Sequence, residues 1–444
     1  MKMFRLLPLF VAVGAALSVP VQAQSLVKLY ESARSFDASY QSAKSQFDAT
    51  LAKADQAKAA ILPVANLAAG YSRSRQGYTA DAATTLDSTY GTQSGTLSAS
   101  QPLYRPANWA SYQQGIKQVD LAQAQLNSAD QDLIVRVSQA YFDVLAAQDS
   151  LAFVQAQKTA VAEQLASAKR NFEVGTATIT DTRDAQAKYD LVIAQEIAAD
   201  NDLRVKKIAL DQLVGSENTK PQSLAQPLVL PALLPDDVST WVKQSEAVHP
   251  GIQQAQIALD VAQLETEKAK AGHKPTLDLG ASYSAINNMD GSSSPGTKGS
   301  HVSSATLGLS FNLPLFAGFA TQNRIRETLS LEEKARNDLE GAKRTVAQAT
   351  RTAYFGVLSG QGQVKAFEAA EASSQSALDA NKLGYQVGVR INIDVLNSQS
   401  QLYDTKARLA KARYDVLVGG LKLRQANGTL KADDLQSVNA LLVK

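Results

Sequence analysis

The side chains that most often carry out catalysis are few in this chain of 444 residues. There is no cysteine, which excludes a thiolate metal site, an iron–sulfur cluster and a cysteine nucleophile. The three histidines, His249, His273 and His301, lack the spacing of metal ligands. The acidic pairs Asp236-Asp237 and Asp433-Asp434 are more typical of a helix start and a solvated tail than of a catalytic dyad. The sequence therefore predicts no enzyme activity, no bound metal and no cofactor.

Two segments, 171–180 and 384–393, are interpreted as tight turns between helices. Each contains an aromatic residue followed, two positions later, by Val-Gly. The glycine of each pair can adopt the left-handed conformation that ends a helix. The polar residues that come next, Thr180, Asp181 and Asp394, suit the first turn of a returning helix. Helix capping is thus one expected role of these side chains, and it is compatible with a second one.

The second turn belongs to a copy of the first half of the chain. Pro63 and Pro102 match Pro275 and Pro314 at an offset of 212 residues, and the two Val-Gly pairs match at 213. So small a change of offset indicates an internal duplication. Prolines exclude regular helix from the segment between the copies. The predicted units are 24–215 and 238–428, joined by a linker at 216–237 and followed by a tail at 429–444.

Very long helices are predicted to position the turns. The segment Pro106 to Arg170 has no internal proline, a single glycine, and many Ala, Gln, Leu and Lys residues, all of which favour helix. At 1.5 Å per residue it would extend about 100 Å, which is typical of coiled coils and tubes. The second copy predicts the same from Ala320 to Leu383.

Four strands with one apolar and one polar face are predicted beside these helices. Leu277, Leu279 and Tyr283, for example, alternate with polar residues and glycine. Within each copy, the two strands are joined by a polar, glycine-rich loop. The predicted strands lie at about 63–76, 91–103, 275–286 and 302–315, and the loops lie at 77–89 and 287–300.

The beginning of the chain indicates export. Lys2 and Arg5 precede an apolar stretch that ends in small residues before Ala23, which predicts a secretory signal peptide at 1–23. The 44 Lys+Arg nearly balance the 42 Asp+Glu, so no basic face for nucleic acid is indicated. No other apolar run approaches 18 residues, so a membrane could be crossed only by strands.

The strand pattern allows two interpretations. Alternation over about ten residues is typical of an outer-membrane β-barrel, but an ordinary half-buried antiparallel sheet has the same period. Export and the length of the helices favour the barrel. Four strands cannot close a barrel, because about eight is the smallest workable number. The barrel interpretation therefore requires oligomers, and three chains would supply twelve strands.

Both turns resemble those of the TolC family of outer-membrane efflux proteins, and the resemblance extends from about Ser25 to Leu430. It implies an α+β membrane protein in which three chains form a twelve-stranded barrel that continues into a helical periplasmic tunnel. The implied function is a passive outer-membrane exit duct of a tripartite efflux or type I secretion system. The implied partners are two further chains, a periplasmic adaptor, an inner-membrane transporter of the RND or ABC type, outer-membrane lipid, and exported small molecules or proteins.

The resemblance also implies roles for particular residues at the turns. Four of them would tether a closed gate: Thr180, Asp181, Tyr385 and Arg390. Arg390 can form bidentate, charge-assisted hydrogen bonds and Tyr385 can donate one, so repeated tethers could bias a two-state gate. The residues that would contact the adaptor are Val174, Gly175, Thr176, Val387, Gly388 and Val389.

An acidic ring at the constriction is the last implied feature. Asp394 would contribute one carboxylate from each chain, and such a ring attracts cations. Asn397 stands where members of the family carry a second acidic residue, so this ring would hold fewer charges.

Two functions of other classes compete with the duct. A soluble periplasmic coiled-coil adaptor would also contain long helices, although it would usually carry one hairpin rather than two equivalent ones. An exported polysaccharide-degrading enzyme would need a pair of catalytic acids, for which the sequence offers no credible candidate.

Overall fold

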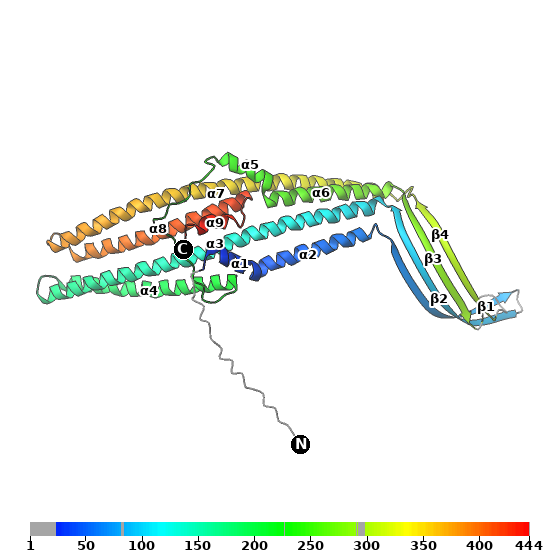
Figure 1. The fold of residues 1–444 in the computed structure, drawn as a ribbon, viewed down its shortest axis with the longest axis horizontal. Helices are drawn as coiled ribbons and strands as arrows, with labels where there is room; N and C mark the ends of the chain where they lie inside the picture. Colours follow the sequence, from blue (N-terminus) through cyan, green and yellow to red (C-terminus); the bar gives the residue numbers. More distant parts are fainter. Residues whose placement is uncertain (1–23, 81–83, 226, 290, 292–297, 444) are drawn as a thin grey trace, which may run out of the picture.

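The computed structural model describes residues 24–80, 84–225, 227–289, 291 and 298–443. The predicted signal peptide at 1–23 lies outside the described residues, as do parts of both predicted loops. Figure 1 shows an elongated molecule with the long helices side by side and the sheet at one end.

Two antiparallel hairpins of long helices make up most of the length. The first joins α3 (Pro106–Glu173) to α4 (Ile179–Val214), and the second joins α7 (Ala320–Gln386) to α8 (Asn392–Asn427). Pro106 is the first residue of α3, where its missing N–H costs no hydrogen bond. Both long helices begin where the sequence predicts and extend three residues beyond the predicted ends.

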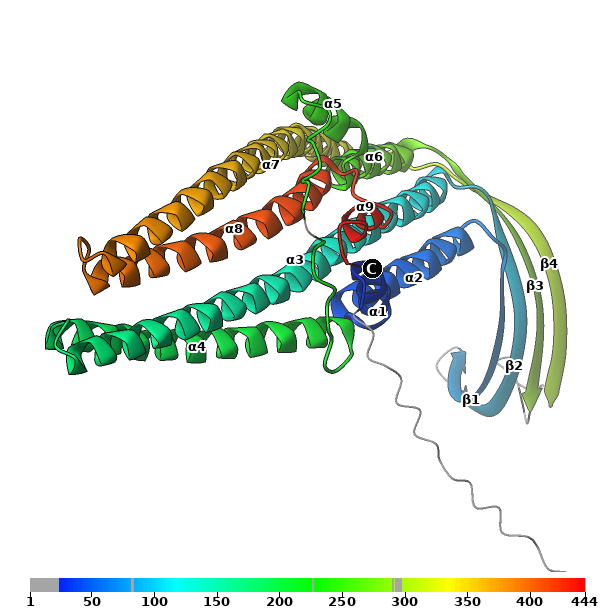
Figure 2. The same cartoon turned by 60° about the vertical axis from the view of Figure 1, so that its left-hand side comes forward.

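Shorter helices flank the hairpins. They are α1 (Leu26–Phe36), α2 (Ala38–Ala59), α5 (Val238–Val248), α6 (Pro250–Lys270), the 3₁₀ turn η1 (Ala271–His273) and α9 (Asp434–Asn439). The described part of 216–237 contains no helix, and it runs between the two hairpins (Figure 2). None of the helices in the described part of the chain combines the length and hydropathy needed to cross a membrane.

The four strands form one antiparallel sheet in the order β1-β2-β3-β4. Their bounds are Val64–Ala80, Thr84–Tyr104, Thr276–Met289 and Gly299–Asn312. The predicted loop at 77–89 is therefore wrong in its bounds: pairing of β1 with β2 continues to Ala80 opposite Thr84. Backbone hydrogen bonds join strands whether or not the side chains are apolar. The polar sequence of this segment therefore gave no sign that the two strands continue to pair there. The loop predicted at 287–300 is likewise shortened, by pairing that continues to Met289 opposite Gly299.

One face of this sheet is apolar and exposed in the single chain. Leu67, Leu97 and Tyr283 lie opposite one another on three adjacent strands, and all are more than half exposed. The opposite face is polar, with a hydrogen bond between Ser284 and Ser304. This is the alternation that the sequence predicts for strands β3 and β4.

The largest core cluster lies in the middle of the molecule, where α3 meets α1, α8 and α9. Tyr141 and Phe142 are fully buried there in an edge-to-face contact with ring centroids 5.4 Å apart. The Tyr141 hydroxyl donates to the carbonyl oxygen of Gln222 at 2.8 Å, which fixes the linker against α3. This core holds the two hairpins together far from both the sheet and the turns.

Candidate functional site

Both hairpins end in the same kind of turn. Gly175 and Gly388 have φ of 77° and 79°, the left-handed conformation expected from the sequence. The N–H of Thr176 donates to the Asn171 carbonyl at 2.8 Å, and the equivalent bond joins Val389 to Gly384 at 2.9 Å. These bonds close each turn using backbone groups alone.

The turns present apolar side chains to solvent. Val174, Val387 and Val389 are 73%, 65% and 75% exposed. Three exposed valines at the ends of two long hairpins form the apolar tip of the chain, which we define by these three residues. The sequence interpretation assigned the adaptor contact to this tip.

In the first turn, Asp181 is engaged by its own helix. Its carboxylate accepts from the Thr178 N–H at 3.0 Å and from the Thr178 hydroxyl at 2.7 Å, while the Asp181 N–H donates to the Thr178 hydroxyl oxygen at 3.2 Å. This reciprocal capping box satisfies two free N–H groups at the start of α4. Thr180 is exposed beside it. The capping role expected of Asp181 is thus present.

The second turn is built from different polar residues. Arg390 Nη1 lies 3.7 Å from Asp394 Oδ2, one helical turn away, and the two side chains are 58% and 33% exposed. The Tyr385 hydroxyl accepts from Asn171 Nδ2 at 3.3 Å. Within one chain the structure therefore does not join the four predicted tethers to one another. Asp181 is occupied by its capping box, and the carboxylate nearest to Arg390 is Asp394.

A fully buried amide ties the second hairpin to the first. Asn392 Nδ2 donates to the backbone carbonyl of Asp181 at 3.2 Å, and Asn392 Oδ1 accepts from Gln164 Nε2. Asn392 is 0% exposed, so its hydrogen bonds are shielded from water. α8 is thus bound to both α3 and α4 immediately above the turns.

Sequence reasoning missed Asn392 and its partner Gln164, as well as Asn171. A signal was present in the comparison of the two copies. Asn392 stands where the first copy has Ile179, a polar residue against an apolar one. Since the first copy has an apolar residue at this position, the shared fold does not require Asn392, and its bonds to Gln164 and Asp181 join the two copies.

Asp394 and Asn397 lie three positions apart in α8, and so on one side of the helix. Asn397 is exposed and Asp394 is half-buried. Because Arg390 is close to Asp394, the carboxylate that one chain could offer to a ring is partly compensated. The ring itself needs other chains and stays a prediction.

Polar contacts between α3 and α8 continue above the turns. Gln157 donates to Ser400 at 3.3 Å, and Lys422 donates to Gln139 at 2.8 Å. We call the line of contacts from Gln139 to Asn171 on α3, with their partners on the second hairpin, the inter-hairpin seam. It is mostly uncharged.

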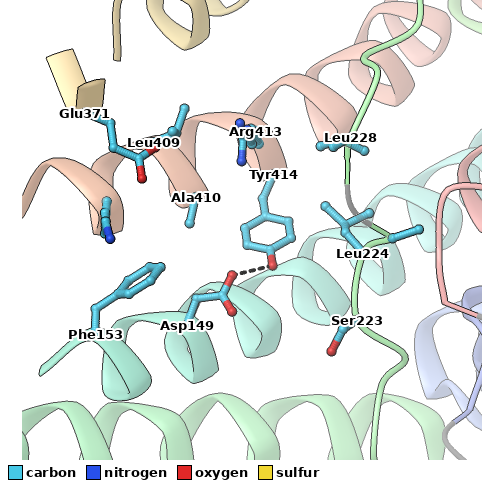
Figure 3. A pocket seen from close by; sticks show the side chains of 12 residues that line it. Asp149, Phe153, Ser223, Leu224, Leu228, Glu371, Leu409, Ala410, Arg413 and Tyr414 are labelled. Atoms are coloured by element: carbon cyan, nitrogen blue, oxygen red, sulfur yellow. Dashed lines mark hydrogen bonds between the residues drawn. The ribbon is translucent and has the colours of Figure 1, made fainter. Parts of the chain in front are cut away.

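One carboxylate interrupts the seam. The Tyr414 hydroxyl donates to Asp149 Oδ2 at 2.6 Å beside a cavity of about 440 Å³ (Figure 3). Burial raises the pKa of Asp149, and the hydrogen bond from Tyr414 opposes that rise. Arg413 and Glu371 line the same cavity. Among the described contacts of the seam, this one alone combines a raised carboxyl pKa with a bond between the hairpins.

The three histidines lie on different elements: His249 precedes α6, His273 is in η1 and His301 is in β4. His249 Nδ1 accepts from the Gly251 N–H at 3.0 Å and so caps α6, and burial lowers the pKa of this imidazole. Among the described residues, no group of three His, Cys, Asp or Glu side chains is placed to hold a metal ion.

Comparisons with known proteins agree with this geometry. A family profile described as "Outer membrane efflux protein" matches residues 29–216 and 241–429. The "Outer membrane protein TolC" of Vibrio cholerae is 34% identical over 439 residues, which span 99% of this chain and 98% of that protein. The "Alkaline protease secretion protein AprF" of Pseudomonas aeruginosa is 31% identical, over 95% of this chain and 88% of that protein.

The fold is also known from solved structures. The outer membrane protein VceC from Vibrio cholerae superposes with a TM-score of 0.76 over 91% of this chain and 96% of that one, at 19% identity. The resemblance inferred from the two turns is thereby confirmed at the level of family and fold. With a profile that matches most of both halves and a relative of nearly equal extent, the chain belongs to the outer membrane efflux protein family.

Proposed function

We propose that three copies of this chain close into a single twelve-stranded barrel that continues into a helical tunnel in the periplasm. As a member of its family, the chain is an outer-membrane exit duct for efflux or secretion. The observation that carries the trimer is the open sheet. β1 and β4 are edge strands in the described chain, and the apolar face is exposed. Closure would pair both edges and place that face in lipid.

The duct is passive, and its cargo is delivered by other proteins. AprF is named for the secretion of alkaline protease, so a secreted protein is one class of cargo among relatives. For this chain we propose a periplasmic adaptor and an inner-membrane transporter that supplies the energy. The exposed valines of the apolar tip support docking there, because the adaptor would bury them.

Gating follows from the position of the seam. Tyr385 and Asn392 bind the second hairpin to the first beside the turns, which supports a tunnel that stays narrow while these bonds hold. Docking would favour the state in which the hairpins separate. Thr180 and Arg390 are proposed to bond across neighbouring chains, since neither bonds to the other predicted tethers within one chain.

Fractionation tests the trimer directly. The expected result is retention in the outer membrane, oligomers that dissociate on heating before gel electrophoresis, and single-channel conductance after reconstitution into planar bilayers. Release of the mature protein with the periplasm, as a water-soluble monomer, would overturn the proposal. The periplasmic adaptor considered from the sequence is not favoured, because the relatives are outer-membrane and secretion proteins.

Docking at the tip is tested by Val389→Glu, which adds a charge to an exposed apolar side chain. Copurification with the adaptor should fall at least tenfold, because burying an unpaired carboxylate is costly. Val443→Glu, also at an exposed valine but near the C-terminus, is the matched control. Equal copurification of both variants would remove the tip from the docking surface.

A further inference from the structure

A second cavity lies at the other end of the molecule, where β2 runs into α3. It has a volume of about 410 Å³ and is bounded by α3 on one side and α6 on the other. Leu103, Tyr104 and Trp109 contribute its apolar wall, and these side chains are 51%, 47% and 53% exposed. Exposed apolar and aromatic side chains gathered in one place are typical of a surface that contacts a ligand, a membrane or a partner.

The strand register shows which face of the sheet this cavity continues. Tyr104 is paired with Leu277, and Leu277 with Phe311, after a bulge in β2 between Pro102 and Tyr104. Residues directly opposite one another in a sheet project from the same face. Tyr104 therefore belongs to the apolar face, and the cavity opens at the end of that face nearest the helices.

The charges around the cavity do not cancel. Arg105 is bound to Asp278 through two hydrogen bonds of 2.7 Å, and Glu267 is paired with Lys270 at 2.9 Å. Lys274 also lines the cavity, and it takes part in no ion pair within the described part of the chain. One positive charge is thus left uncompensated beside the aromatic wall.

The position of the cavity keeps it open in an assembly. α3 packs against α6, with α2 on the outer side of α3 and α7 on the outer side of α6. If chains join through their edge strands, α2 and α7 meet the neighbours, and the groove between α3 and α6 stays within one chain. The following inference rests on that proposed barrel.

We propose that this cavity binds the headgroup of an anionic glycerophospholipid in the periplasmic leaflet of the outer membrane. The ammonium group of Lys274 pairs with the phosphodiester. The Trp109 N–H and the Tyr104 hydroxyl donate at the level of the ester groups, where such amphipathic rings are favoured. The acyl chains follow the apolar face of β2 and β3 into the membrane.

The internal repeat limits the site to one per chain. At the equivalent positions in the other copy, Lys274 is replaced by Leu62 and Trp109 by Thr321. Neither the cation nor the indole is therefore present at the second sheet–helix junction. A trimer would hold three such lipids.

The test is native mass spectrometry of the purified, delipidated full-length protein, titrated with dioleoyl phosphatidylglycerol or with dioleoyl phosphatidylcholine. These lipids share their acyl chains and differ in net charge. The wild type should retain three phosphatidylglycerol molecules per trimer and fewer of phosphatidylcholine. Lys274→Gln should weaken phosphatidylglycerol binding about fivefold, the usual effect of one Lys near an anionic lipid surface. Lys382→Gln, an equal charge change at an exposed position near the turns, should leave it unchanged.

The outcomes separate this inference from the proposed function. Equal binding by the wild type and Lys274→Gln would overturn the lipid site while trimers and conductance remain. Full displacement of the lipid by soluble glycerol phosphate would also overturn it, because a site for the phosphate group alone would then explain the binding. Trp109→Leu, measured on the same trimers, should lower binding of both lipids. Absence of trimers and conductance in the wild type would instead refute the barrel.

Discussion

At the scale of single residues, two kinds of polar contact with different strengths hold the segments beside the two turns. Buried Asn392 is bonded to α3 and α4, whereas the Arg390–Asp394 pair is partly exposed to solvent. Exposed ion pairs contribute about 0 to 1 kcal/mol, but a buried amide that loses its partners costs about 1 to 3 kcal/mol. Within one chain, the stronger tie is therefore Asn392.

Conductance through single channels measures these ties. Tyr385→Phe combined with Arg390→Ser should raise it, because bonds that hold the second hairpin inward are removed. Asn392→Ala should raise it further, since the Gln164 and Asp181 groups lose a shared partner. Ser437→Ala, far from the turns, serves as the control. Unchanged conductance in both tip variants would exclude these residues from the gate.

Block by divalent cations measures the predicted acidic ring. Asp394→Ala should weaken the block severalfold, because one carboxylate from each chain is lost from the constriction. Asn397→Asp should strengthen it by adding an acid on the same side of α8. Identical block curves for the wild type and Asp394→Ala would show that no ring forms.

At the scale of elements, the inter-hairpin seam contains a carboxylate whose charge opposes packing. The raised pKa of Asp149 means that the folded state favours its neutral form. The stability that the neutral form provides is complete below the unfolded pKa near 4. It is lost as pH rises through the raised folded pKa, so α3 and α8 should hold together more firmly in acid.

Asp149→Asn tests this dependence, because asparagine keeps an oxygen that can accept from Tyr414 and carries no charge. At neutral pH the variant should unfold at a higher temperature than the wild type, and the difference should vanish near pH 4. Asp415→Asn removes a charge that is 55% exposed on α8, next to Tyr414 in the sequence, and should show no such trend. A pH-independent difference at position 149 would contradict the argument.

The junction of α1 and α2 depends on Asp37, a carboxylate whose pKa is shifted in the opposite direction to that of Asp149. Asp37 caps α2 and receives two hydrogen bonds from Arg136, at 2.9 and 3.0 Å, which hold its pKa below the usual range. Its contribution to stability is present above pH 4 and is lost as pH falls through the lowered pKa. Asp37→Asn keeps a good cap but should cost about 2 kcal/mol of unfolding free energy.

Asp132→Asn is the matched control for that change, because Asp132 pairs with the same Arg136 but is 55% exposed. It should cost at most about 1 kcal/mol. Thermal unfolding of both variants at pH 7 makes the comparison. Equal losses would mean that burial does not distinguish the two carboxylates.

The elements themselves were largely readable from the sequence, whereas the partners of the side chains at the turns were not. The start of α3 at Pro106 and the left-handed Gly175 and Gly388 follow from local chemistry. The bond between Asn171 and Tyr385 joins residues 214 positions apart, and local pattern contains no information on such a pairing. The ends of β1 and β2 were mispredicted because hydrogen-bonded pairing does not require apolar residues.

At the scale of the whole molecule, the two faces of the sheet should differ in whether they tolerate a charged residue. Leu307 is 76% exposed on the apolar face, and Thr306 lies on the opposite face. Leu307→Arg should abolish outer-membrane assembly, since an arginine facing lipid costs about 2 to 4 kcal/mol near mid-membrane. Thr306→Arg should assemble normally. Heat-sensitive oligomers in membrane fractions provide the measurement, and equal assembly of both variants would refute a lipid-facing apolar surface.

The difference between the two copies has a consequence for stoichiometry. Each chain offers two turns with the same backbone, but one is flanked by Thr178 and Asp181 and the other by Tyr385 and Arg390. Around a threefold axis these turns would alternate as six sites in two chemical environments. A partner that occupied all six sites with identical subunits would have to bind as three equivalent pairs, with the two subunits of each pair in different environments.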